Sequence, residues 1–205
     1  KPTYGRVSRY GLIAYASSLD QIGPLSTNVQ DAATVLSAIC GQDPHDNTTS
    51  QRPVEDFGCK IGESLKGKVI GVPKEYFAEG LDAGCKSAIE NVLKKAEAEG
   101  AVLKEISMPN ISYAVASYYI IATAEASSNL SRFDGVRYTY RSKEAKNLYD
   151  LYAMSRSEAF GKEVQRRIML GSYVLSSGFF DAYYVQAQKV RRLISEDFTK
   201  AFEIG

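Results

Sequence analysis

The chain of 205 residues is 44% hydrophobic and 24% charged, which is typical of a globular protein and excludes disordered and collagen-like classes. The 25 Lys and Arg nearly balance the 24 Asp and Glu, so the net charge of +1 gives no overall attraction to nucleic acid or membrane. No apolar run reaches the roughly 18 residues of a membrane-spanning helix. The chain has three cysteines, which are far apart in the sequence: Cys40, Cys59 and Cys85. They predict neither a disulfide framework nor a zinc site, so we expect no metal in this chain and a location in the reducing cytoplasm.

Glycine and proline interrupt every helical window in the first 26 residues, at Gly5, Gly11 and the pair Gly23-Pro24. This pattern predicts short strands and tight turns. A helix follows, because Thr27 or Asn28 can cap apolar residues that recur at helical spacing up to Gly41. The polar stretch 42–53 predicts a loop.

The segment 68–108 predicts a strand, a helix and a second strand. Residues 68–73 form a short apolar run, and residues 85–96 carry an apolar stripe at helical spacing. Gly100 ends the helix, and Pro109 closes a second apolar run over 101–108. Two strands joined by a helix are expected to lie parallel.

Helical patterns dominate the second half of the chain. We predict helices over 112–132, from about 144, over 162–175 and over 179–202, with a loop at 132–143. The architecture is therefore expected to be α/β, with a helix-rich second half.

Few residues suggest chemistry on their own. His45, the only histidine, could act as a base or a metal ligand, but its polar loop favours a solvated role. No G-x-S-x-G motif surrounds a serine, and no glycine-rich phosphate loop is present. The basic and aromatic stretch 132–143 suits nucleic acid less than it suits a mixed surface loop.

Two residues leave alternatives open. Arg167 could pair with Glu163 one helical turn earlier, or it could bind a carboxylate with its planar guanidinium. Tyr118 shares a helix face with Ala122, Glu125 and Asn129, and it could line a ligand pocket or fill a core.

Four strings spread over the chain carry a resemblance: KPTYGRVSRYGLIAYASSLDQIGPLS at the start, KVIGVPKEYF at 68–77, YYIIATAEASSNLSRFDGVRY at 118–138, and GKEVQRRIMLGSYVLSSGFFDAYYVQAQKVR at 161–191. Together they resemble the amidase signature family, and most closely its glutamine-hydrolysing branch in tRNA-dependent amidotransferases. The resemblance implies part of the amidase-signature fold, a mixed central sheet flanked by helices. It also implies one partial domain over residues 1–205, truncated at both ends.

In that family a serine nucleophile, a second serine and a lysine hydrolyse the amide. By resemblance these three residues lie upstream of Lys1, so no catalytic residue is expected in this sequence, which should be inactive alone. The resemblance assigns glutamine binding to Tyr118 and Arg167. It also implies B and C subunits as partners. Ammonia would pass to one partner subunit, which holds ATP, Mg²⁺ and Glu-tRNA(Gln), and no cofactor is expected in this chain.

Two alternatives remain at this stage. The chain could belong to a stand-alone amide hydrolase of the same family, or it could be a non-catalytic scaffold or binding module.

Overall fold

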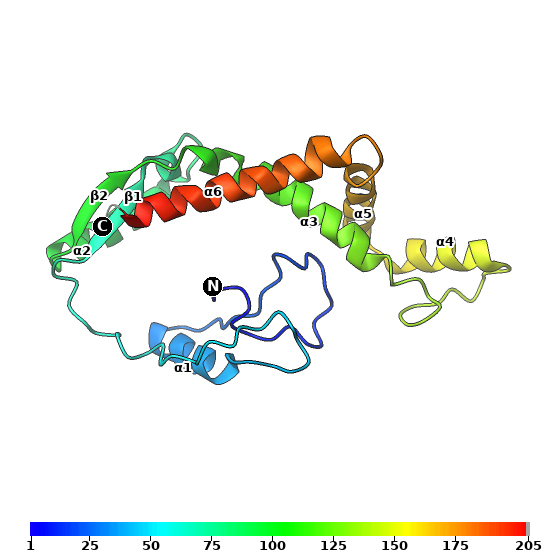
Figure 1. Ribbon diagram of the computed structural model, residues 1–205, viewed down its shortest axis with the longest axis horizontal. Helices are drawn as coiled ribbons and strands as arrows, with labels where there is room; N and C mark the ends of the chain where they lie inside the picture. Colours follow the sequence, from blue (N-terminus) through cyan, green and yellow to red (C-terminus); the bar gives the residue numbers. More distant parts are fainter. Residues whose placement is uncertain (204–205) are drawn as a thin grey trace. The chain divides into compact units, whose positions relative to one another are not determined.

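The computed structural model describes residues 1–203, which form two compact units (Figure 1). The first unit comprises residues 1–61 and 119–184, and the second comprises residues 62–118 and 185–203. The chain passes from the second unit to the first within helix α3 (Ala114–Leu130). One partial domain over residues 1–205 stays a prediction.

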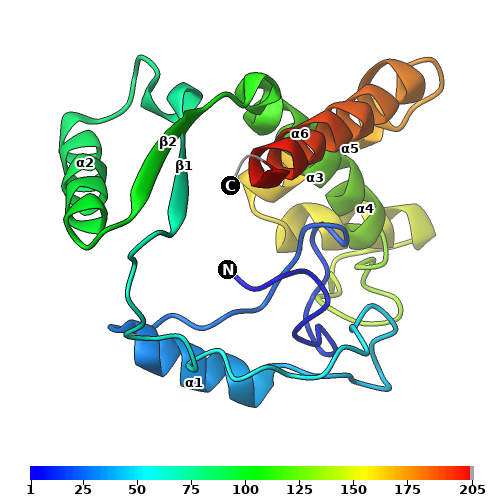
Figure 2. The same cartoon turned by 60° about the vertical axis from the view of Figure 1, so that its left-hand side comes forward.

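The second unit contains the predicted strand, helix and strand. Strand β1 (Val69–Pro73) pairs in parallel with β2 (Val102–Ile106). They are joined by the short helix η1 (Lys74–Phe77) and by α2 (Ala83–Ala98), which lies beside the strands (Figure 2).

Local chemistry sets the bounds of α2. The carboxylate of Asp82 accepts a hydrogen bond from the N–H of Cys85 at 3.0 Å and so caps the first turn. Past the other end, Gly100 has a φ of +95°, which a residue with a side chain rarely adopts. The chain can therefore turn sharply from the helix into β2.

A buried carboxylate attaches the last helix of the second unit. Helix α6 (Gln186–Glu203) carries Asp197, which accepts hydrogen bonds from the backbone N–H and the side-chain amide of Asn110, at 2.9 and 3.0 Å. Asn110 belongs to η2 (Pro109–Tyr113), the short helix that follows β2. Three hydrogen-bonding groups are thereby satisfied away from water.

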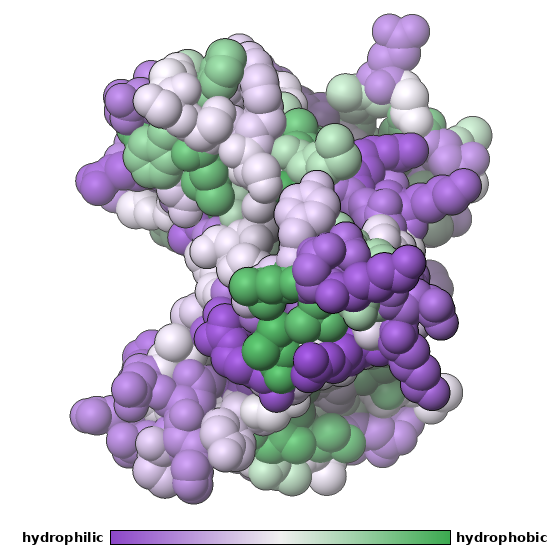
Figure 3. All heavy atoms as spheres, turned by 90° about the vertical axis from the view of Figure 1, so that its right-hand side faces the viewer, coloured by the Kyte–Doolittle hydropathy of each residue, from purple (hydrophilic) through white to green (hydrophobic). Residues whose placement is uncertain are grey.

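Helix α3 forms the core of the first unit. Its side chains Ile121, Ala122 and Ala124 are each 1% exposed. Three further helices complete this unit: α1 (Val29–Ile39), α4 (Leu148–Ala159) and α5 (Lys162–Val174). On the face drawn in Figure 3, apolar side chains (green) also reach the surface between polar ones (purple).

The comparison with the predicted elements is mixed. The α/β class, the parallel strand pair and the cap at Asn28 are confirmed. The short strands predicted before residue 26 are wrong, since that region contributes a single bridge, between Val7 and Cys40. Its backbone instead bonds to side chains, as Arg9 does to Asp46 at 2.8 Å.

Two further features differ from expectation. Within residues 1–203 the sheet consists of two parallel strands, where a mixed sheet was expected. A π-helical segment, η3 (Asp181–Val185), precedes α6 where one continuous helix was predicted. No helix of the described part of the chain is long and apolar enough to span a bilayer.

Candidate functional site

Arg167 in α5 is held by two partners from different parts of the first unit. Its Nε donates a hydrogen bond of 2.9 Å to Oε1 of Glu163, one turn earlier in the helix. Its Nη1 donates a bond of 2.9 Å to the hydroxyl of Tyr15, which is 152 residues away in the sequence. The Arg167 side chain remains 31% exposed. It is therefore both oriented and accessible.

The charges around Arg167 favour its cationic form. Its pKa is raised above the ordinary arginine value by the hydrogen bonds to Tyr15 and then to Glu163. The pKa of Glu163 is lowered, chiefly by the hydrogen bond from Arg167, with a further contribution from the charge of Arg166. Glu163 also accepts a bond of 3.1 Å from Arg166. Two guanidinium groups thus share one carboxylate, and one positive charge is left over.

Tyr15 lies in a segment whose backbone is fixed by side chains. The carboxylate of Asp20 accepts from the N–H groups of Tyr15 and Ala16, at 2.8 and 3.0 Å. The side-chain amide of Asn129 in α3 donates to the carbonyl of Tyr15 at 3.1 Å. Both backbone polar groups of Tyr15 are therefore bonded, which restrains the position of its hydroxyl.

A polar pocket of about 370 Å³ adjoins this segment. Its wall includes Glu125 of α3, whose carboxylate accepts from the N–H of Ser18 at 2.9 Å. All of the lining residues have polar side chains, and all lie in the first unit: Tyr4, Ser17, Ser18, Glu125, Ser128 and Asn129. The pocket is an open, polar surface hollow beside the segment of Tyr15.

Close packing of α5 on α3 determines the position of the Arg167 backbone. A side chain at Gly171 would overlap the backbone carbonyl of Thr123. Next to it, the hydroxyls of Ser127 and Ser172 are hydrogen-bonded at 2.9 Å. Arg167 lies one turn before this contact, so the contact fixes the point from which its side chain extends.

The structure does not bring the two predicted glutamine contacts into one described site. Tyr118 is 44% exposed and lies in the second unit, whereas Arg167 lies in the first. A common pocket for these two residues stays a prediction. Of the residues predicted on the same helix face, Ala122 is buried, and Glu125 and Asn129 hold the segment of Tyr15.

Sequence reasoning missed Tyr15. No local periodicity marks it, because it lies in irregular backbone and its partner is distant in the sequence. The pair of Glu163 and Arg167 was among the alternatives considered, and the structure shows that this pair and an oriented guanidinium coexist.

The other candidates have ordinary surface contacts. His45 is exposed, with Nδ1 3.1 Å from a carboxylate oxygen of Asp43, as expected of a loop residue. In the basic and aromatic loop, Asp134 accepts from the backbone N–H of Val136 at 2.9 Å and is paired with Arg137 at 3.4 Å. These contacts are typical of a structured surface loop.

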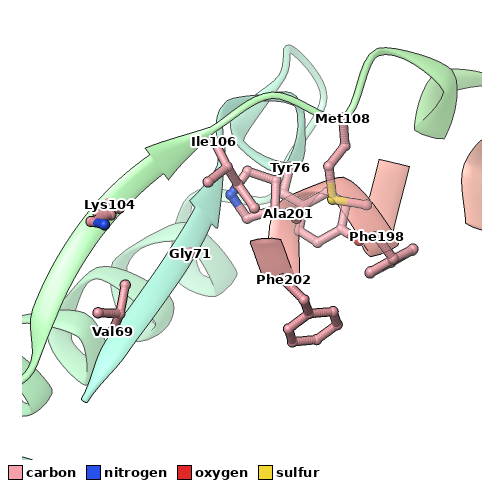
Figure 4. Close-up of a pocket in the computed structure, with 10 residues that line it drawn as sticks. Val69, Gly71, Tyr76, Lys104, Ile106, Met108, Phe198, Ala201 and Phe202 are labelled. Carbon is pink, nitrogen blue, oxygen red and sulfur yellow. The ribbon is translucent and has the colours of Figure 1, made fainter. Parts of the chain in front are cut away.

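A second pocket, of about 240 Å³, lies in the second unit between β1, β2 and α6 (Figure 4). Its lining is mainly apolar, with Met108, Phe198 and Ile106 among its members, and Lys104 is its one charged residue. Its only titratable side chains are those of Lys104 and Tyr76. Within residues 1–203 no group of three or more His, Cys, Asp or Glu side chains is arranged to hold a metal ion.

The fold agrees with comparisons with known proteins. A model of the amidase family matches residues 1–204. The chain therefore belongs to the amidase family.

Particular relatives narrow the class. Over 203 residues the chain is 58% identical to the A subunit of glutamyl-tRNA(Gln) amidotransferase from Ruthia magnifica subsp. Calyptogena magnifica, and 57% identical to that from Staphylococcus carnosus. Each alignment covers 99% of this chain and 42% of the relative. The chain thus spans less than half the length of these relatives.

Solved structures give the same result. The crystal structure of the A subunit of glutamyl-tRNA(Gln) amidotransferase from Thermotoga maritima is 42% identical, with a TM-score of 0.72 over 98% of this chain and 38% of that one. A peptide amidase from Stenotrophomonas maltophilia is 28% identical, with a TM-score of 0.62 over 90% of this chain and 38% of that one. Both the fold class and the family resemblance are confirmed.

Proposed function

We propose that this chain is part of the glutamine-hydrolysing subunit of a tRNA-dependent amidotransferase. Such a subunit releases ammonia from glutamine, and the ammonia converts Glu-tRNA(Gln) to Gln-tRNA(Gln). The relatives at 57–58% identity support this proposal, because they carry the name of the corresponding subunit. The structural observation that supports it is Arg167, an oriented and accessible guanidinium.

The chemistry of glutamine accounts for an arginine at this position. The α-carboxylate is a planar anion that simple amides lack, and a guanidinium can bind it through two parallel hydrogen bonds. Arg167 would therefore select glutamine over other amides. We assign Tyr118 as a second glutamine contact, in which its hydroxyl forms a hydrogen bond to glutamine.

The remaining parts of the reaction belong elsewhere in the proposed assembly. The serine nucleophile, the second serine and the lysine would come from another part of the same polypeptide, so we expect no turnover from these 205 residues alone. The B and C subunits would complete a cytoplasmic heterotrimer, in which one of these partners binds ATP, Mg²⁺ and the tRNA. This chain would supply one part of the glutamine pocket and its scaffold.

The experiment is Arg167→Ala in the full-length protein, assembled with its partners. The KM for glutamine should rise about 100-fold, since a hydrogen-bonded ion pair is worth roughly 1.5–3 kcal/mol. Hydrolysis of a small primary amide without a carboxylate should be unchanged. Arg192→Ala is the matched control, because Arg192 forms the same i,i+4 pair with Glu196 on α6. An unaltered glutamine KM in Arg167→Ala would refute the assignment.

Similarity to the peptide amidase supports a second candidate, a stand-alone amide hydrolase. Purification of the full-length protein separates the two candidates. Co-purification with two further subunits and transfer of ammonia to Glu-tRNA(Gln) support the amidotransferase. Full activity on simple amides without partners supports the hydrolase.

A further inference from the structure

We propose that Glu163 and Tyr15 are positioning residues, which hold the guanidinium of Arg167 in one orientation for the α-carboxylate of glutamine. This inference rests on the proposed function, because it assumes that Arg167 binds glutamine. It adds two residues to the proposed glutamine site, each with its own role. Glu163 restrains the guanidinium from within α5, and Tyr15 restrains it from the N-terminal segment.

The geometry of the bonds supports this role. A guanidinium has five N–H donors in one plane. Glu163 takes the donor on Nε and Tyr15 takes one on Nη1, both at 2.9 Å. Two bonds from different directions fix the plane of a side chain that is otherwise flexible. Among residues 1–203 no acceptor takes a hydrogen bond from Nη2, so both of its donors are available for a carboxylate.

The chemistry of the two partners differs in a useful way. Tyr15 offers a neutral oxygen, so it orients Arg167 without cancelling its positive charge. Glu163 carries a negative charge, but Arg166 and Arg167 both pair with it. The Glu163 side chain is also 57% exposed, so solvent screens its charge. The N-terminal end of α5 therefore keeps a net positive charge to attract the anion.

The position of Tyr15 is itself determined by buried or bonded groups. Asp20 accepts from its N–H, and Asn129, which is 9% exposed, donates to its carbonyl. The guanidinium carbon of Arg167 lies 5.9 Å from the centre of the Tyr15 ring, so the ring also borders the cation. The backbone of Tyr15 is thus held in place, and its side chain extends from there to Arg167.

The test uses Tyr15→Phe and Glu163→Gln in the full-length protein within its complex. The first variant keeps the ring and removes the acceptor, and the second keeps the shape and removes the charge. Each should raise the KM for glutamine about 5-fold to 10-fold while kcat stays within about twofold, because ground-state and transition-state binding are weakened equally. Hydrolysis of a small amide without a carboxylate should not change.

A double-mutant cycle tests whether the effect passes through Arg167. In an Arg167→Ala background, neither substitution should raise the KM further. Matched controls are Tyr10→Phe, an exposed tyrosine in the same segment, and Glu196→Gln, in the equivalent pair on α6. Glu163 is at the surface, so Glu163→Gln provides the test even where Tyr15→Phe lowers the yield of folded protein.

Two outcomes overturn the inference. One is an unchanged glutamine KM in both single variants while Arg167→Ala raises it. The other is an equal rise in KM with and without Arg167, which would place the effect elsewhere. If Arg167→Ala itself leaves the KM unchanged, the glutamine-binding role of Arg167 fails first, so the two failures are distinguishable.

Discussion

Gly171 of α5 lies against the backbone carbonyl of Thr123 in α3, in a contact with no room for a side chain. The two helices can approach this closely because glycine has no Cβ. Thr123 is 1% exposed, so the contact lies in the core of the first unit. Because Arg167 lies one helical turn before Gly171, this contact also fixes the position of the Arg167 Cα.

Gly171→Ala should therefore be strongly destabilising. The added methyl group meets backbone, which cannot move aside as the end of a flexible side chain can. We expect the free energy of unfolding of the full-length protein to fall by about 3 kcal/mol, as measured by urea denaturation. The KM for glutamine should also rise, because α5 is displaced.

Gly161→Ala is the matched control in the same helix. Gly161 precedes the first residue of α5, and a side chain there would meet nothing within 4 Å. Its replacement should lower the free energy of unfolding by at most about 1 kcal/mol, the cost of a poorer N-cap. Equal losses at the two glycines would contradict the packing argument.

Tyr118→Phe tests the second proposed glutamine contact. Loss of one hydroxyl hydrogen bond should raise the KM for glutamine roughly tenfold, which corresponds to about 1.4 kcal/mol. Tyr119→Phe is a close control, since Tyr119 is the next residue and is 47% exposed against 44% for Tyr118. The assignment fails if both variants have the same KM as the parent protein.

Asp197→Ala should loosen the second unit and leave the contacts of Arg167 in the first unit unchanged. The substitution leaves the backbone N–H and the side-chain amide of Asn110 without their acceptor in a part-buried position. We expect a loss of about 2 kcal/mol in the free energy of unfolding. Glu196→Ala, at the neighbouring position, whose side chain is 44% exposed, should cost under about 0.5 kcal/mol. A similar loss in both variants would show that Asp197 has no special role.

Asp46 should make stability depend on pH. Its pKa is lowered to about 2, first by the hydrogen bond from the Thr48 hydroxyl and then by backbone N–H groups, including that of Arg9. Because the folded-state pKa lies below the unfolded value, its contribution is complete above about pH 4 and is lost as the pH falls toward 2.

Asp46→Asn in the full-length protein checks this dependence. Thermal unfolding should show a lower Tm than the parent protein at about pH 7, and the difference should shrink as the pH is lowered below about 4. A difference that is constant or grows as the medium becomes more acidic would contradict the assignment of the carboxylate.

Local sequence signals predicted the elements whose stability is local. Helix α1 begins where Asn28 can cap it, and α2 ends before Gly100, because caps and glycine turns act within a few residues. The parallel pairing of β1 with β2 follows from the helix between them. The four long strings also predicted the family, because they are spread over the whole chain and each resembles it.

The sequence by itself thus determined the α/β class, most helices and the family, and it proposed Tyr118 and Arg167. The tertiary structure alone decided how Arg167 is held. The bond from Arg167 to Tyr15 joins positions 152 residues apart, and the irregular segment of Tyr15 is fixed by side chains of α3. No periodicity can encode such a contact, because it depends on how close α5 comes to α3, which a single glycine at 171 permits.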